Sequence, residues 1–163
     1  MAEVPVPSPV RLRAATGGDV AAVRDLVLAA YGHYVERIGR RPAPMDADHG
    51  RAVRDGLVTV AEADGKVVGL LVLVEADDHV LVEDVAVAPD RQGQGTGALL
   101  LRHAEAHARA LGRDELRLYT HEAMVENLAL YARHGFVETH RASEDGFRRV
   151  FLTKVLGGAG REA

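Results

Sequence analysis

Residues 85–97 read VAVAPDRQGQGTG, a β-rich run that stops at a proline and leads into three alternate glycines. Glycine has no Cβ, so successive backbone amides in such a segment can turn toward one point. The helical pattern that follows, residues 97–111, adds free N–H groups and the positive end of a helix dipole. The segment therefore predicts an anion site suited to a phosphate or pyrophosphate, and a merely flexible turn is the less favoured interpretation.

Residues 93–98 also fit the G-x-G-x-x-A dinucleotide fingerprint, and Asp114 lies about twenty residues beyond the first glycine, as that fingerprint expects. Three features oppose a dinucleotide site. Residues 89–92 separate the β-rich run from the first glycine, Asp114 precedes the next strand instead of ending it, and three β-rich runs precede a motif that should open such a fold. A Walker loop is excluded because no Gly-Lys-Ser/Thr follows the glycines.

The periodicity of the whole chain predicts a mixed α+β sheet rather than strict βαβ alternation. Thr16 and Asp19 form a capping box before the first helix, and an Asp-Gly turn at 64–65 joins two strands. We expect strands over 10–13, 57–62, 67–75, 80–88, 116–120, 136–140 and 147–156, and helices over 20–30, 46–55, 97–111 and 125–134.

Composition excludes several classes of function. The 163 residues suit one domain, which we expect over residues 10–156 between a flexible N-terminus at 1–9 and a flexible tail at 157–163. The chain has no cysteine, which excludes a disulfide framework, a thiolate nucleophile and a cysteine zinc site. A net charge of −4 without a Lys/Arg block argues against nucleic acid as a partner.

The sequence also argues against membranes and metals. It has no apolar run of about 18 residues and its proline-rich N-terminus has no apolar core, so we expect neither a membrane span nor a signal peptide. A soluble, cytoplasmic protein follows by default. His103 and His107 form an i, i+4 pair without a third ligand in sequence, so we expect exposed helix histidines and no metal site.

Two segments resemble the signatures of the GNAT acyltransferase superfamily. The first signature is Gln/Arg-x-x-Gly-x-Gly/Ala after a strand that ends V-A-V-x-P, and residues 85–97 carry both parts. The second is Leu-Tyr-x-x-x-Gly-Phe near the last helix, and residues 130–136 read LYARHGF. The resemblance extends from about residue 10 to residue 156. It implies the GNAT fold, a mixed and mostly antiparallel sheet of about seven strands flanked by about four helices.

The resemblance implies acetyl-CoA as the cosubstrate. Amides of residues 92–98 would hold the pyrophosphate, the backbone of Val85 and Val87 would pair with the pantetheine arm, and the amides of residues 85–87 would face the thioester carbonyl. Oxyanion stabilisation of that kind contributes about 3–4 kcal/mol to an acyl transfer. The cofactor-binding residues so implied are Val85, Ala86, Val87, Gln92, Gly93, Gln94, Gly95, Thr96, Gly97, Ala98 and Asn127.

The resemblance also implies that Tyr131 protonates the departing thiolate. A phenol suits this role, because the solution pKa values of a phenol and a thiol differ by only about 1–2 units. Many family members carry an asparagine seven residues before this tyrosine. This chain has Met124 at that place, and its asparagine is Asn127, four residues before the tyrosine. We therefore expect Asn127 to reach the pantetheine or the adenine side.

The amine that attacks a thioester must be neutral, so a base has to remove its proton directly or through water. In a strand over residues 80–88, strict alternation puts residues 81, 83, 85 and 87 on one face. Glu83 would then lie beside the thioester, and it is the candidate base. Two alternatives stay open: Glu83 as a solvated or ion-paired strand residue, and Glu83 as a group that only orients the acceptor.

Residues 31–45 are the expected acceptor wall, with Tyr31, Tyr34 and Arg37 as the substrate-binding residues. The arginines of this segment suggest a carboxylate or a phosphate on the acceptor, which a guanidinium can bind through two hydrogen bonds. A solvated polar face around a short helix is the alternative interpretation.

These residues predict an N-acetyltransferase that moves the acetyl group from acetyl-CoA to a primary amine, on a small molecule or a peptide, by direct attack in a ternary complex. The absence of cysteine disfavours a route through an acetylated enzyme. The alternative is a non-catalytic acyl-CoA-binding or regulatory module. Tyr131 favours the enzyme, because a module that only binds needs no acid for a thiolate. Members of the family often dimerise, which leaves a homodimer open.

Overall fold

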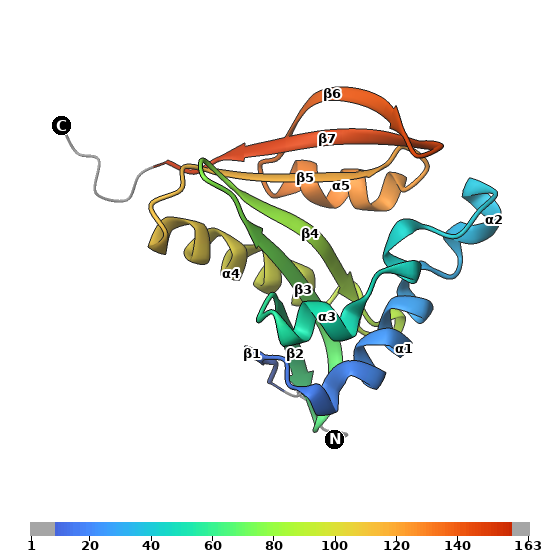
Figure 1. The fold of residues 1–163 in the computed structure, drawn as a ribbon, viewed down its shortest axis with the longest axis vertical. Helices are drawn as coiled ribbons and strands as arrows, with labels where there is room; N and C mark the ends of the chain where they lie inside the picture. The colour runs from blue at the N-terminus through green and yellow to red at the C-terminus, as the bar shows by residue number, and fades with distance from the viewer. Residues whose placement is uncertain (1–8, 158–163) are drawn as a thin grey trace, which may run out of the picture.

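The strands of this chain form one open sheet in the order β1-β2-β3-β4-β5-β7-β6 (Figure 1). The computed structural model describes residues 9–157, so nearly all of the flexible ends expected at 1–9 and 157–163 lie outside the described residues. β4 and β5 run parallel, and the other neighbouring strands are antiparallel. The strands are β1 (Arg11–Ala14), β2 (Val58–Ala63), β3 (Lys66–Glu75), β4 (Val80–Val87), β5 (Glu115–His121), β6 (Val137–Glu144) and β7 (Phe147–Val155). The expected mixed, mostly antiparallel α+β sheet is confirmed.

Five α-helices accompany the sheet in the described part of the chain, where the sequence predicted about four. The additional helix is the five-residue α2, which ends at Gly39 with a φ of +86° before the prolines that follow. None of the helices within residues 9–157 is long and apolar enough to cross a membrane. The helices are α1 (Val20–Tyr31), α2 (Tyr34–Ile38), α3 (His49–Arg54), α4 (Thr96–Ala110) and α5 (Val125–Arg133), with 3-10 turns η1 (Gly17–Asp19), η2 (Ala43–Asp46) and η3 (Pro89–Arg91).

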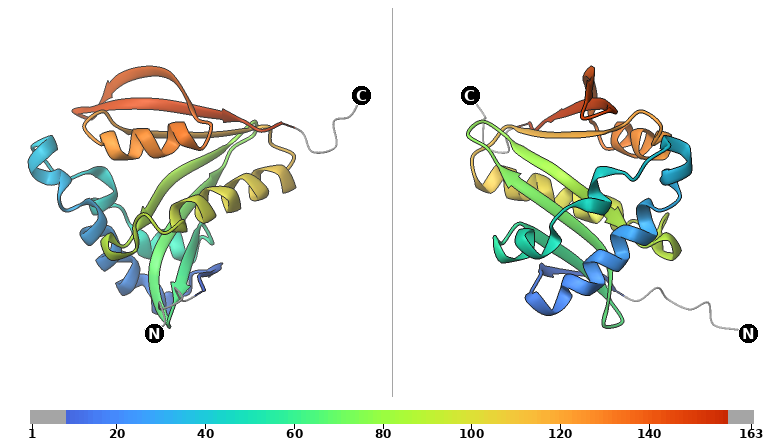
Figure 2. Two further views of the ribbon diagram at one scale, coloured as in Figure 1. Left: turned by 180° about the vertical axis from the view of Figure 1, so that it is seen from behind. Right: turned by 45° about the vertical axis from the view of Figure 1, so that its right-hand side comes forward.

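Helices cover both faces of the sheet, as the two views of Figure 2 show for α4 and α1. On one face, Leu100 of α4 and Tyr131 of α5 are buried in the same apolar cluster. On the other face, Val23 of α1 and Val53 of α3 belong to a second cluster. From Leu70 to Leu73, successive residues of β3 alternate between the two clusters, as the pleat of a strand buried on both faces requires.

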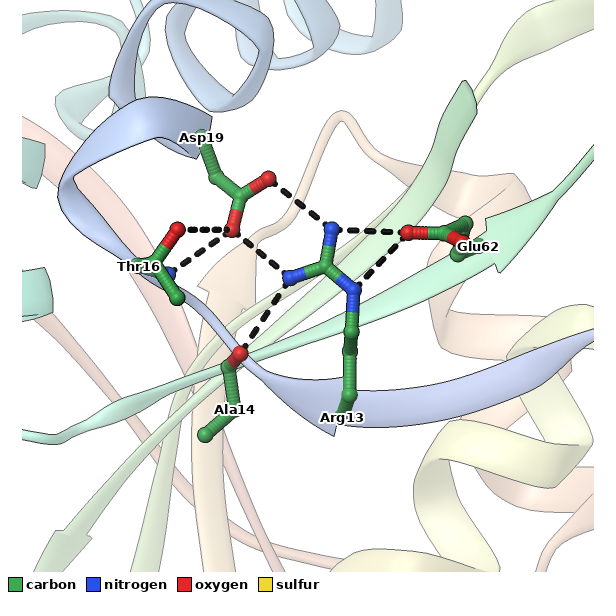
Figure 3. Close-up of polar contacts among 5 residues, drawn as sticks. All are labelled: Arg13, Ala14, Thr16, Asp19 and Glu62. Atoms are coloured by element: carbon green, nitrogen blue, oxygen red, sulfur yellow. Dashed lines mark hydrogen bonds and ion pairs between the residues drawn. The ribbon is translucent and has the colours of Figure 1, made fainter. Parts of the chain in front are cut away.

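The predicted capping box at Thr16 and Asp19 is present, and Arg13 extends it (Figure 3). The Thr16 N–H donates to Asp19 Oδ2 at 2.7 Å, while Arg13 donates to both oxygens of the same carboxylate at 2.8 and 3.0 Å. Arg13 Nε also donates to Glu62 Oε2 at 2.8 Å. These bonds hold the pKa of Asp19 well below its usual range, with the Arg13 bond as the largest cause. One guanidinium thus ties β1, the start of α1 and β2 together.

The sheet opens between β4 and β5, where the two strands separate toward their C-terminal ends (Figure 1). They pair over only three residues of β4, from Val80 to Val82. The register of β4 against β3 shifts at the same point, since Val82 pairs with Leu73 and Asp84 pairs with Val72. Glu83 is therefore the extra residue of a β-bulge, a feature that bends the strand that carries it. The bulge lies where the β4–β5 ladder ends.

Candidate active site

The glycine-rich segment forms a tight loop before α4. Gly93 and Gly95 have φ values of +78° and +88°, a conformation that glycine adopts at little cost, and open space surrounds both positions. Gly95 is the N-cap of α4, and the first bond of the helix runs from the Leu99 N–H to the Gly95 carbonyl at 3.0 Å. The amides of residues 96–98 precede that bond, so they are available to an anion at the positive end of a fifteen-residue helix.

The backbone of β4 faces the opening in the sheet at every second residue. The Ala88 N–H donates to the Val68 carbonyl of the β3 side at 2.8 Å. In an antiparallel ladder, odd and even residues direct their N–H and C=O groups to opposite sides, so Val85 and Val87 direct theirs away from β3. Two contacts agree with this direction: the Val85 carbonyl accepts from Tyr31 Oη at 3.2 Å, and the Val87 carbonyl accepts from Gln92 Nε2 at 3.2 Å.

The loop cavity, of about 470 Å³, lies between the glycine segment, this edge of β4 and helix α5. Nine of the eleven residues expected to bind the cofactor line this cavity, whereas Gln94 and Thr96 do not. Asn127 is among the nine, on the α5 side, and its Nδ2 lies 3.6 Å from Met124 Sδ. The lining residues are Ala30, Tyr31, His33, Tyr34, Val85, Ala86, Val87, Arg91, Gln92, Gly93, Gly95, Gly97, Ala98, Glu126, Asn127, Leu130, Tyr131, Arg133 and His134.

The hydrophobic cavity, of about 310 Å³, lies on the other side of the opening between β4 and β5. Most of its wall is apolar or aromatic and comes from residues 38–52, β4, β5, the start of α5 and the first residue of β7. The lining residues are Tyr31, Ile38, Pro42, Ala43, Pro44, Ala47, Asp48, His49, Ala52, Val72, Val82, Glu83, Asp84, Val85, Tyr119, Thr120, His121, Met124, Tyr131, Phe147 and Arg149.

Tyr131, the predicted acid, lines both cavities, and so do Tyr31 and Val85. The Tyr131 ring is buried, and it packs edge-on against Phe136 with 5.8 Å between the ring centroids. Burial, together with the negative charge of Asp84, raises the pKa of Tyr131 well above that of a free phenol. The hydroxyl therefore carries its proton throughout the neutral range, as an acid must before it acts.

Asp84 is a polar group of this site that the sequence did not single out. Its carboxyl is buried beside the hydrophobic cavity and accepts a hydrogen bond of 2.6 Å from Tyr31 Oη. Burial raises the pKa of Asp84 to about 6, although the Tyr31 bond acts in the opposite direction. The sequence shows Asp84 as a carboxyl within a β-rich run, but its burial follows from the bulge, which puts Asp84 on the same face of β4 as Ala86, toward α1.

Glu83, the predicted base, is exposed and lines the hydrophobic cavity. The alternation that placed it on one face with Val85 and Val87 is wrong, because the bulge interrupts it. Val82 and Val85, three positions apart, contribute to the same apolar cluster on the α4 face. Glu83 thus reaches the site as the extra residue of the bulge and not as a regular member of the Val85 face.

The three residues expected to bind the acceptor lie in different parts of the structure. Tyr31 lines both cavities, whereas Tyr34 lines the loop cavity only and donates to Glu126 Oε2 at 3.0 Å. Arg37 lines neither cavity and pairs with the same carboxylate at 2.8 Å. That Arg37 bond is the largest of the causes that lower the pKa of Glu126 to about 2. The segment 31–45 contributes to the hydrophobic cavity through its apolar residues instead of its arginines.

A protein-family model described as an acetyltransferase (GNAT) domain matches residues 54–138, just over half of the chain. Streptothricin acetyltransferase of Streptomyces lavendulae is 33% identical over 76 residues. That match covers 45% of this chain and only 40% of the length of the streptothricin enzyme.

Solved structures resemble nearly the whole chain. PaiA N-acetyltransferase of Thermoplasma acidophilum, in complex with coenzyme A, superposes with a TM-score of 0.76 at 17% identity, over 90% of this chain and 99% of the other. A GNAT family acetyltransferase of Elizabethkingia anophelis with acetyl-CoA bound superposes with a TM-score of 0.65 at 23% identity, over 90% and 98% of the two chains. At these identities the likeness shows the fold.

Proposed function

This chain belongs to the GNAT acetyltransferase family, and we propose that it transfers an acetyl group from acetyl-CoA to a primary amine by direct attack while both substrates are bound. The observation that carries the proposal is the position of Tyr131, which lines the loop cavity and the hydrophobic cavity at once. An acid for the leaving thiolate has to lie where the cosubstrate meets the acceptor, and Tyr131 occupies such a junction.

The loop cavity fits coenzyme A by its chemistry. A pyrophosphate suits the amides of residues 96–98 and the open, left-handed turns at Gly93 and Gly95. The pantetheine arm suits the edge of β4, since Val85 and Val87 direct backbone groups toward the gap that β5 leaves. Gln92 Nε2 donates to the Val87 carbonyl in the structure, so we expect that side chain to move or to remain beside the arm.

Acetyl-CoA, when bound, supplies the thioester carbonyl and the thiolate leaving group. The N–H groups of Val85 and Val87 are the donors that can stabilise negative charge on a carbonyl oxygen in the gap. Tyr131 gives its proton to the departing sulfur, which leaves as a thiol. The phenolate then takes a new proton from solvent, which its raised pKa favours.

One of the two carboxyls at the β4 bulge accepts the proton of the amine. Glu83 is exposed at the hydrophobic cavity, so it can take a proton from the ammonium form and pass it to solvent. Asp84 is buried behind it, and with a pKa of about 6 it is mostly ionised at pH 7. We assign the base to Glu83, and we infer that Asp84, through its charge and its Tyr31 bond, positions the groups around it.

A ligand-binding experiment followed by a turnover experiment tests this function. We expect acetyl-CoA and CoA, but not NAD, to raise the melting temperature of the protein, because ligands stabilise the state that binds them. We expect release of CoA thiol from acetyl-CoA only when an amine is present, across a panel that includes streptothricin. Stabilisation by NAD alone would refute the proposal. Stabilisation by CoA without turnover on any amine would instead identify an acyl-CoA-binding module.

A further inference from the structure

We propose that the acceptor is a small primary amine whose remaining part is apolar and carries no carboxylate or phosphate, bound in the hydrophobic cavity with its nitrogen toward Glu83 and Asp84. This inference rests on the proposed function and names the substrate class of the same site.

The wall of the cavity is apolar where an acceptor's body would lie. Ile38 and Pro42 come from the segment after α1, Val72 from β3, Met124 from the start of α5 and Phe147 from β7. Four of these side chains are largely buried before any ligand binds, so the wall is preformed. A cavity of about 310 Å³ is at the small end of the range of about 300–1,000 Å³ typical of ligand sites, which favours a small acceptor.

The charged residues in the wall favour a cation. Three carboxyl side chains line the cavity, from Asp48, Glu83 and Asp84. The one guanidinium among the lining residues belongs to Arg149, which pairs with Glu144 at 2.8 Å and lies over the ring of Tyr119 at 4.6 Å. An ammonium group is attracted to such a site, whereas a carboxylate or phosphate on the acceptor is repelled by it.

The two histidines in the wall add no lasting positive charge. Burial lowers the pKa of His49, and Arg24 lowers it further; burial also lowers the pKa of His121. Both rings are therefore neutral at pH 7 and above. His49 Nε2 is buried and has no hydrogen-bond partner within residues 9–157.

The arginines that first suggested an anionic acceptor are engaged elsewhere. Arg37 pairs with Glu126 at 2.8 Å, and Arg41 pairs with Asp46 at 2.9 Å. Arg40 donates to the Asp145 carbonyl at 2.8 Å and lies over the Phe147 ring at 3.9 Å. None of the three lines the hydrophobic cavity. The Arg40 guanidinium instead lies against Phe147, which lines the cavity, while Arg40 itself does not line it.

The test is a comparison of kcat/KM between amines that differ in one property. From propylamine to hexylamine, we expect kcat/KM to rise by roughly fourfold for each added methylene until the cavity is filled, which is the factor that burial of one methylene predicts. Hexylamine and 6-aminohexanoate differ by a terminal carboxylate, and we expect the carboxylate to lower kcat/KM by at least about tenfold.

A cavity-filling variant tests whether the chain-length dependence of kcat/KM arises in the hydrophobic cavity. Ala52 lines the cavity, and Ala52→Leu should lower kcat/KM for hexylamine more than for propylamine, because less space remains for the longer chain. Ala106→Leu, on the exposed side of α4, is the matched control and should change neither value. Stabilisation by CoA should be the same in both variants, which shows that each is folded.

The outcomes separate the two proposals. Acetylation of 6-aminohexanoate or of streptothricin with a higher kcat/KM than hexylamine overturns the apolar acceptor and leaves N-acetylation standing. An alkylamine series without any rise, or an Ala52→Leu variant with an unchanged chain-length preference, also overturns the apolar acceptor. Failure of every amine to release CoA overturns both proposals together.

Discussion

Tyr31 Oη donates a hydrogen bond of 2.6 Å to Asp84 Oδ1, which joins the last residue of α1 to the middle of β4 across 53 positions of sequence. The same hydroxyl lies 3.2 Å from the Val85 carbonyl, on the edge of β4 that faces the opening in the sheet. A buried carboxyl needs such a donor, because an unpaired charge in the interior is costly. The bond therefore fixes α1 against the strand that lies between the two cavities.

Removal of the Tyr31 hydroxyl should destabilise the protein. We expect Tyr31→Phe to lower the free energy of unfolding by about 1–3 kcal/mol at pH 7, because it leaves the buried Asp84 carboxylate without its donor. Urea unfolding at pH 7 measures the loss. Tyr119→Phe is the matched control, since the Tyr119 side chain is only partly buried. Equal losses in the two variants would contradict the role given to the Tyr31–Asp84 bond.

The titration of Asp84 should appear in the pH dependence of stability. Its pKa in the folded protein is about 6, above its ordinary value, so the folded state holds this proton more tightly than the unfolded state. The stability that follows is fully present below about pH 4 and is lost as the pH rises through about 6. Relative to the wild type, Asp84→Asn should therefore gain about 2 kcal/mol between pH 4 and pH 7.

Urea unfolding at several pH values between 4 and 7 checks this prediction, with Asp90→Asn, at an exposed position, as the control. A difference between Asp84→Asn and the wild type that stays constant over this range would show that Asp84 does not titrate there.

Loss of the Tyr131 hydroxyl should slow the reaction without weakening cosubstrate binding. We expect Tyr131→Phe to lower kcat by about 100-fold or more, the size typical of general acid catalysis. Burial of the ring is retained, so the Kd for acetyl-CoA measured by calorimetry should change by less than about threefold. A variant with wild-type kcat would remove Tyr131 from the mechanism.

Loss of the Glu83 carboxylate should slow acetyl transfer. We expect Glu83→Ala to lower turnover at least about tenfold and to shift the pH dependence of kcat/KM, because the amine then loses its proton acceptor. Rates measured from pH 5 to pH 9 over a range of alkylamine concentrations, with saturating acetyl-CoA, test this. An unchanged rate together with an unchanged profile would rule out Glu83 as the base.

The left-handed turn at Gly95 should matter for both folding and cosubstrate binding. An alanine at a φ of +88° costs about 1–2 kcal/mol, so Gly95→Ala should lower stability by that amount or displace the start of α4. A displaced helix start moves the amides offered to the pyrophosphate, and we expect the Kd for CoA to rise at least about tenfold. Gly17→Ala, where φ is not positive and open space surrounds the residue, should leave the Kd for CoA unchanged.

Local patterns in the sequence were sufficient to predict the strands and the α-helices of this fold, except for the five-residue α2. Apolar spacing gave the strands and the long helices to within about two residues at most ends, although β6 extends to Glu144, beyond the predicted end at residue 140. The capping box and the Asp-Gly turn at 64–65 have the backbone conformations that their residues favour, with positive φ at Asp64 and Gly65. Each of these features depends on residues that are neighbours in the chain.

The site was harder to predict, because it is formed by contacts between elements that are far apart in the sequence. The bulge at Glu83 arises from the register of β4 against β3, so alternation within β4 alone placed that side chain on the wrong face. The partner of Arg37 is Glu126, 89 residues later, and this contact turns a presumed substrate-binding arginine into part of the connection between α2 and α5. Asp84 was visible as a carboxyl in a β-rich run, but its burial depends on the bulge and its donor, Tyr31, belongs to another element.

β4 and β5 share only three residue pairs before they separate, so the sheet consists of two parts that are paired over one short stretch. The part formed by β1 to β4 leads into the glycine loop. The part formed by β5, β7 and β6 carries Tyr119 and Phe147 of the hydrophobic cavity. The proposed pantetheine arm would pair with the edge of β4 that β5 leaves uncovered. We therefore expect bound coenzyme A to reduce motion between the two parts of the sheet.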